Sequence, residues 1–173
     1  MNIAHLCIEQ LSDAHAGPIQ QYQQSPVPAE GLYVKKEWFQ YWANRPEKGP
    51  GDRIVQSWDT ASKDGAFSDF SVCITALVRK GDVFVLDVFR AKLLFPDLKH
   101  KAIELARKWG IDVLLIEDAA SGQQLLQVLK RTKPLGVPRP IARKPEGDKI
   151  SRFSGQTHRI EAGGLFLPKQ ATW

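Results

Sequence analysis

The sequence predicts an α/β fold in which helices cover the faces of a mixed β-sheet. Three segments rich in β-branched and aromatic residues come first, at residues 54–59, 70–79 and 83–89, and they are typical of β-strands. After them, helical and strand-like segments alternate to the end of the chain. Strands in succession followed by alternating helices and strands form a mixed sheet with helices packed on it.

Turn and end signals mark the first hairpin and the first helix. Lys80-Gly81-Asp82 is a turn, so segments 70–79 and 83–89 are expected to pair as an antiparallel hairpin. The next helix begins near Pro96-Asp97 and ends at Gly110. Its apolar residues recur at helical spacing, at Leu98, Ala102, Leu105, Ala106 and Trp109.

The second half of the chain alternates strand and helix. Residues 111–117 are almost continuously apolar, which is typical of a central strand covered on both faces. A helix opens at Ser121-Gly122 and ends at Pro134, and its apolar side is Leu125, Leu126 and Leu129. A short strand at 137–142, a helix at 150–161 and a brief strand at 165–167 follow.

One arrangement of these strands makes a functional prediction. If segment 111–117 lies beside segment 54–59 and runs parallel to it, their C-terminal ends share one edge of the sheet. Ligands of α/β sheets bind at that edge.

Composition excludes several classes of protein. The chain has 173 residues with 24 Lys+Arg against 19 Asp+Glu, a net charge of +5 and two cysteines, which indicates a globular domain and not a secreted disulfide scaffold. No apolar stretch approaches the roughly 20 residues that span a bilayer, so we expect a soluble intracellular protein. A pI near 9.3 admits an anionic partner such as nucleic acid.

Residues 1–51 are predicted to be an N-terminal arm or linker, and residues 52–173 the folded domain. The arm shows no sustained period and carries loop signals such as Gly17-Pro18 and Gly49-Pro50-Gly51. Its aromatic pairs Trp38-Phe39 and Tyr41-Trp42 are costly to leave in water, so the second part of the arm is expected to pack onto another surface; a flexible extension is the alternative.

Carboxylates stand where the first and the fourth predicted strands end. Asp59 closes one and Glu117 closes the other. Adjacent strands lie about 4.8 Å apart, so the two side chains can share a divalent cation through hard oxygen ligands, and one or two Mg²⁺ would suit the site. Asp69, where the second strand begins, is a third carboxylate near the same edge. The alternative for any one of them is a solvated turn residue or a helix cap.

Basic residues gather late in the chain. Between residues 130 and 159 two acids, Glu146 and Asp148, accompany nine cations: Lys130, Arg131, Lys133, Arg139, Arg143, Lys144, Lys149, Arg152 and Arg159. Next to a carboxylate cluster, such a patch would offset phosphate repulsion and hold a nucleic-acid backbone without reading its sequence. The candidate DNA contacts are Arg143, Lys144, Lys149 and Arg152; a solubilising face is the alternative.

Several motifs, in this order, resemble the C-terminal nuclease domain of the large terminase subunit of tailed phages. They are Val55-Gln56-Ser57-Trp58-Asp59-Thr60-Ala61, Ser68-Asp69-Phe70-Ser71-Val72, Leu115-Ile116-Glu117-Asp118-Ala119-Ala120-Ser121-Gly122, and Gly147-Asp148-Lys149 with Arg152. Upstream, Gln21-Tyr22-Gln23-Gln24, Pro26-Val27-Pro28 and Trp38-Phe39 resemble the linker that follows the motor domain in those proteins.

The resemblance implies a ribonuclease-H-like fold, a mixed five-stranded sheet with helices on both faces. It also implies Mg²⁺- or Mn²⁺-dependent cutting of concatemeric double-stranded DNA during genome packaging in a bacterial host, by a phage or prophage protein. Asp59 matches the first metal carboxylate and Glu117 the second, with Asp118 as a substitute ligand. The implied partners are DNA, the terminase ATPase domain, the small terminase subunit and the portal.

Two departures from the family pattern define the alternatives. The chain carries no Gly-x-x-x-x-Gly-Lys-[Ser/Thr] phosphate loop and no ATPase domain, and it ends at Trp173, where the family's acidic segment with the third metal carboxylate is expected to begin. Weak or absent cleavage is therefore expected, and a DNA-binding or assembly module without catalysis is one alternative. The second alternative is a different ribonuclease-H-like enzyme, a resolvase or transposase core. This alternative leaves the Gln-Tyr-Gln-Gln arm unexplained.

Overall fold

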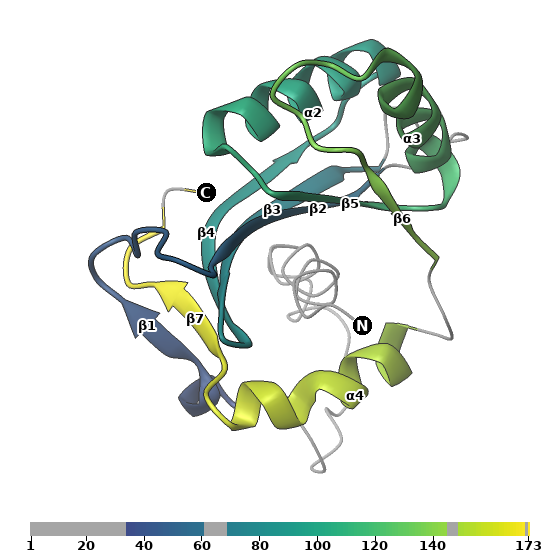
Figure 1. The fold of residues 1–173 in the computed structure, drawn as a ribbon. Helices are drawn as coiled ribbons and strands as arrows, with labels where there is room; N and C mark the ends of the chain where they lie inside the picture. The colour runs from purple at the N-terminus through teal and green to yellow at the C-terminus, as the bar shows by residue number, and fades with distance from the viewer. Residues whose placement is uncertain (1–33, 61–68, 145–148, 172) are drawn as a thin grey trace.

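A computed structural model describes residues 34–60, 69–144, 149–171 and 173. The described chain forms one seven-stranded mixed sheet with the strand order β1-β7-β4-β3-β2-β5-β6. Three helices pack on it, α2 and α3 on one face and α4 on the other (Figure 1). The Gln-Tyr-Gln-Gln, Pro-Val-Pro and Gly147-Asp148 motifs lie outside the described residues, as do the aromatics before Val34.

The predicted elements occur in the predicted order, and two short elements in the arm, η2 and β1, precede them. They are η2 (Lys36–Trp38), β1 (Gln40–Trp42), β2 (Arg53–Asp59), β3 (Ser71–Arg79), β4 (Asp82–Ala91), α2 (Phe95–Trp109), β5 (Val113–Glu117), α3 (Ala120–Thr132), β6 (Ile141–Arg143), α4 (Lys149–Glu161) and β7 (Leu165–Pro168). The predicted fold class is confirmed, but the sheet has seven strands rather than five.

The strands at both edges of the sheet differ from the predicted ones. Next to β4 lies β7, and β1 extends the sheet beyond it, because Gln40–Trp42 of the arm pairs in parallel with β7. A three-residue strand is too short to show a period of its own. At the other side β6 begins only at Ile141, because Pro138 and Pro140 have no N–H to donate to a ladder.

Strand pairing confirms the arrangement on which the site prediction depends. The hairpin β3–β4 is antiparallel, and β3 also pairs with β2 in antiparallel register. Strand β5 lies beside β2 and runs parallel to it, and β6 continues the sheet in parallel beyond β5. The C-terminal ends of β2, β4, β5 and β6 therefore share one edge of the sheet, which we call the C-edge.

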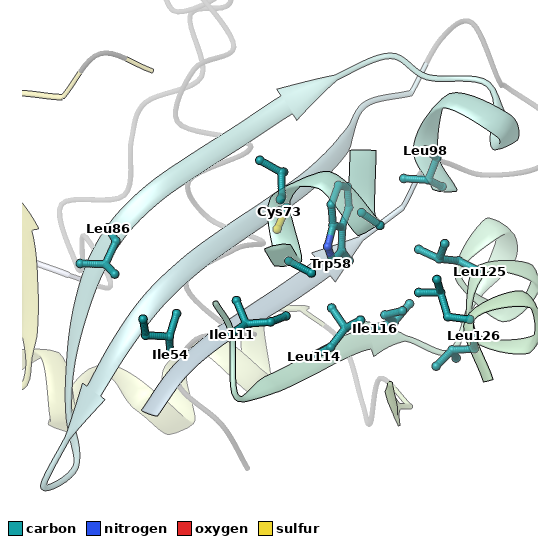
Figure 2. Close-up of a cluster of buried hydrophobic side chains, with 14 of the residues drawn as sticks. Ile54, Trp58, Cys73, Leu86, Leu98, Ile111, Leu114, Ile116, Leu125 and Leu126 are labelled. Atoms are coloured by element: carbon teal, nitrogen blue, oxygen red, sulfur yellow. The ribbon is translucent and has the colours of Figure 1, made fainter. Parts of the chain in front are cut away.

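The core has two layers, one on each face of the sheet. In β3, Cys73 and Leu77 belong to the cluster that α2 and α3 cover, and Val72 and Ile74 to the cluster that α4 covers. Figure 2 shows the first cluster, in which strand side chains meet those of the helices, such as Leu98 and Leu125. Each buried leucine contributes about 1.5–3 kcal/mol, so docking on the sheet stabilises these helices.

Local signals end the first two helices as the sequence indicates. Gly110 closes α2 in a left-handed conformation, φ 55°, and its N–H bonds back to the last turn. In α3 the closing residue is Lys133, φ 45°, directly before Pro134, because a proline disfavours helical geometry in the residue that precedes it.

The arm's second part packs on the sheet. Trp38 and Phe39 contact the cluster under α4, and Trp42 contacts the cluster under α2 and α3. A second link is polar: Arg79 donates to Asp52 Oδ2 at 2.7 and 3.0 Å and to the Glu47 carbonyl at 2.7 Å. The segment between β1 and β2 is thus tied to the end of β3.

Candidate metal and DNA site

The two strand-end carboxylates, Asp59 and Glu117, are neighbours at the C-edge. Trp58 pairs with Ile116 across β2 and β5, and Asp59 and Glu117 are the next residues on these parallel strands. Trp58 and Ile116 belong to the core under α2 and α3, so alternation places both carboxylates on the α4 face. Both side chains are half-buried, as expected for carboxylates at the rim of a core.

Glu117 is positioned by the first turn of α3. A Cβ on Gly122 would lie 2.1 Å from the Glu117 carbonyl oxygen, so only glycine lets the helix approach the strand end this closely. On the other side of β5, the Asp118 N–H donates to the Arg143 carbonyl at 2.7 Å. The backbone around Glu117 is therefore held from two directions.

The remaining carboxylate candidates lie close by in sequence but do not complete a cluster. Asp69 is exposed and precedes β3, whose Val72 pairs with Asp59, and Asp118 is half-buried and directly follows Glu117. Among the residues that the structure describes, no three His, Cys, Asp or Glu side chains gather closely enough to hold a metal ion. Asp69 and Asp118 as further ligands remain predictions.

The four predicted DNA-binding residues divide between β6 and α4. Arg143 pairs with Glu117 in the β5–β6 ladder, and it is exposed, as is Lys144. Lys149 and Arg152 belong to the first turns of α4, the helix that packs on the face of the carboxylates through Phe153. The C-edge thus carries two acidic strand ends, with the basic end of β6 beside them.

A cationic cluster lies at the C-terminal end of β4, and the sequence did not predict it. Arg90 lies over the ring of Phe70, with 3.4 Å from Cζ to the ring centroid, and the Lys92 Nζ lies 5.0 Å from the same centroid. In the printed sequence these two cations look like ordinary strand-end residues. Only the pairing of Arg90 with Val72 reveals that they share the C-edge with Asp59.

The helices were also compared with the requirements of a membrane-spanning segment. In the described part of the chain, no helix combines the length and the apolar character that crossing a membrane requires.

Comparisons with known proteins give the fold a family context. No protein-family model and no curated protein matches the chain. Among solved structures, a large terminase from a thermophilic bacteriophage (crystal form 3) is 7% identical with a TM-score of 0.58, and the match covers 81% of this chain and 34% of that one. Crystal form 2 of the same terminase gives 7% identity, a TM-score of 0.58, and 81% and 33% coverage.

A structure of similar size also matches. The large terminase nuclease from thermophilic phage G20c with bound zinc is 12% identical with a TM-score of 0.57, and the match covers 79% of this chain and 80% of that one. The chain spans about a third of the first terminase, but most of the G20c nuclease. The resemblance found in the sequence motifs is therefore confirmed at the level of the fold, which is the ribonuclease-H-like fold of large-terminase nucleases.

Proposed function

We propose that this chain is a metal-dependent endonuclease domain of a phage or prophage large terminase, acting on double-stranded DNA. The observation that carries the proposal is the pair Asp59 and Glu117, adjacent on parallel strand ends, in a fold shared with terminase nucleases. Concatemeric DNA in a bacterial host is the proposed substrate. The terminase ATPase domain, the small terminase subunit and the portal are the proposed partners.

The residues at the C-edge fit divalent cations. Hard carboxylate oxygens are the ligands that Mg²⁺ and Mn²⁺ prefer, and Asp59 and Glu117 would hold the ion, with Asp69 or Asp118 as a further ligand. Bound there, the cations would stabilise charge that develops on a phosphodiester and favour ionisation of water. The zinc in the G20c nuclease structure supports the use of a divalent metal.

The chain's own residues supply binding and orientation. Arg143 and Lys144 are exposed beside Glu117, so they would hold the phosphates of a strand whose scissile bond lies over the carboxylates. Metal-assisted hydrolysis requires no nucleophilic side chain, and no serine or cysteine nucleophile motif occurs in the sequence.

Plasmid nicking tests the function. We expect Mn²⁺ to support slow nicking by the wild-type chain, Mg²⁺ less, and EDTA none. Asp59→Asn and Glu117→Gln should each lower the rate by about 100-fold or more, because several kcal/mol of charge stabilisation are lost.

Glu104→Gln is the matched control for these variants. Glu104 is an exposed carboxylate on α2 whose partner is Lys101, one turn away, so its loss should leave nicking unchanged. Cutting by Asp59→Asn at the wild-type rate would remove the carboxylate pair from the mechanism.

A DNA-binding or assembly module without catalysis is the second candidate function. It is favoured by the lack of a three-ligand metal group among the described residues. Firm retention of duplex DNA with no cleavage in Mn²⁺, Mg²⁺ or Zn²⁺ would establish this function in place of the nuclease.

A further inference from the structure

One row of five residues crosses the sheet at the C-edge, from β4 to β6. The ladders pair Arg90 with Val72, Val72 with Asp59, and Glu117 with Arg143, and Asp59 and Glu117 are adjacent. Directly paired residues share a face of a sheet, and Val72 belongs to the core under α4, so the whole row lies on the α4 face. An arginine therefore stands at each end of the row, with the two carboxylates between them.

Arg90 lies over an aromatic ring and is exposed. The guanidinium lies over Phe70, which is 38% exposed, and Lys92 approaches the same ring. Both cations are exposed, and within the described part of the chain neither forms an ion pair with a carboxylate. Stacking orients a guanidinium while its N–H groups remain free to donate, which is the geometry that binds phosphate.

In the described part of the chain, the Arg90 end of the row also lies at an unpaired side of β4. Strand β7 pairs with β4 only at Val83 and Phe84, so in the described residues the second half of β4 has β3 as its one neighbour. Along the described strands, a ligand that crosses the C-edge can therefore pass Arg90 and Lys92 where it leaves the sheet.

We propose that Arg90 and Lys92, oriented by Phe70, form a second phosphate-binding cluster, so that the bound DNA strand follows the C-edge from Arg90, outside the buried Val72, past the carboxylates to Arg143. The inference rests on the proposed function and adds the path of the substrate to it. A polyphosphate backbone fits the row because it presents an anion to each arginine and one to the metal-binding carboxylates between them. The arginines lie four strand spacings apart, about 19 Å, so their contributions should add.

Salt-dependent binding of duplex DNA tests the cluster, measured by fluorescence anisotropy with the full chain in Ca²⁺ to limit cleavage. Arg90→Gln and Lys92→Gln should each lower the slope of log affinity against log salt by about 0.9, and Arg90→Gln with Arg143→Gln by about 1.8. Lys80→Gln is the matched control, since Lys80 is an exposed cation in the same hairpin at the opposite end of the strands. Its slope should equal that of the wild type.

Three outcomes would overturn the inference. A wild-type slope in Arg90→Gln would do so, and so would an equal loss of slope in Lys80→Gln. Self-association of Arg90→Gln on gel filtration, with DNA binding unchanged, would show instead that Arg90 prevents the exposed edge of β4 from pairing with another chain.

A separate measurement tests the nuclease proposal: nicking of plasmid DNA in Mn²⁺ by the wild type and by Asp59→Asn. Absent nicking combined with a reduced slope in Arg90→Gln would overturn the nuclease and support the phosphate cluster.

Discussion

At the scale of single residues, Gly122 determines where Glu117 can lie. Its missing side chain leaves room for the Glu117 carbonyl, which is backbone and cannot rotate away from an added methyl group. Gly122→Ala should therefore destabilise the fold by about 1–3 kcal/mol through overpacking and should also lower nicking, because the carboxylate moves with its backbone. Urea unfolding and the plasmid assay measure the two effects.

Gly155 provides the matched control for that substitution. It lies in α4, where an added Cβ meets nothing within 4 Å, so Gly155→Ala should stabilise the protein by roughly 0.5–1 kcal/mol through helix propensity. If both alanines behave alike, the close approach at Gly122 has no energetic consequence.

The choice between Asp69 and Asp118 as a further metal ligand also belongs to the residue scale. Asp69 is exposed and Asp118 half-buried, so asparagine at either position should be tolerated by the fold. We expect one of the two variants, but not both, to weaken Mn²⁺ binding by calorimetry and to slow nicking in parallel. Unchanged metal binding in both would leave Asp59 and Glu117 as the ligands within this chain.

At the scale of elements, Asp52 links the segment after β1 to the end of β3, and this link depends on pH. Hydrogen bonds from Arg79 and from the Gly49 N–H lower the pKa of the Asp52 carboxyl below its ordinary 3.8. A carboxyl with a lowered pKa stabilises the folded state above pH 3.8, and this contribution is lost as the pH falls through the folded-state pKa. Asp52→Asn should therefore lower Tm near pH 7, with a difference from wild type that shrinks below pH 3.8.

Tm measured between pH 2.5 and 7 checks this expectation, with Glu104→Gln as an exposed control. A constant difference between Asp52→Asn and wild type across that range would contradict it.

Asp112 acts in the same direction as Asp52. Burial opposes ionisation of its carboxyl, but hydrogen bonds from Lys48 and the Ile54 N–H outweigh burial and lower its pKa.

At the scale of the whole molecule, the fold divides the basic patch found in the sequence. Arg143 and Lys144 lie at the C-edge, and Lys149 is the first residue of α4. By contrast, α3 is 13 residues long and leads about 20 Å away from that edge. Lys130 of its last turn and the capping residue Lys133 instead line a cavity of about 210 Å³ together with Arg139.

Salt dependence should reveal this division. Lys149→Gln and Arg152→Gln are expected to lower the slope for duplex DNA by about 0.9 each, whereas Lys133→Gln should leave it unchanged. The same anisotropy titration measures all three variants. Equal losses of slope in the three would mean that DNA reaches around α3 and that the patch acts as one surface.

The order of the elements from β2 on and the two strand-end carboxylates follow from the sequence alone, because strand periods, apolar runs and end signals such as Gly110 are local properties. Even the parallel pairing of β2 and β5 is predictable, since a helical crossover favours it. By contrast, pairing register joins segments far apart in the chain and has no local signal. Only the tertiary structure aligned Arg90 and Arg143 with Asp59 and Glu117, added β1 to the sheet beside β7, and pressed Gly122 against Glu117, because each depends on how distant backbones pack.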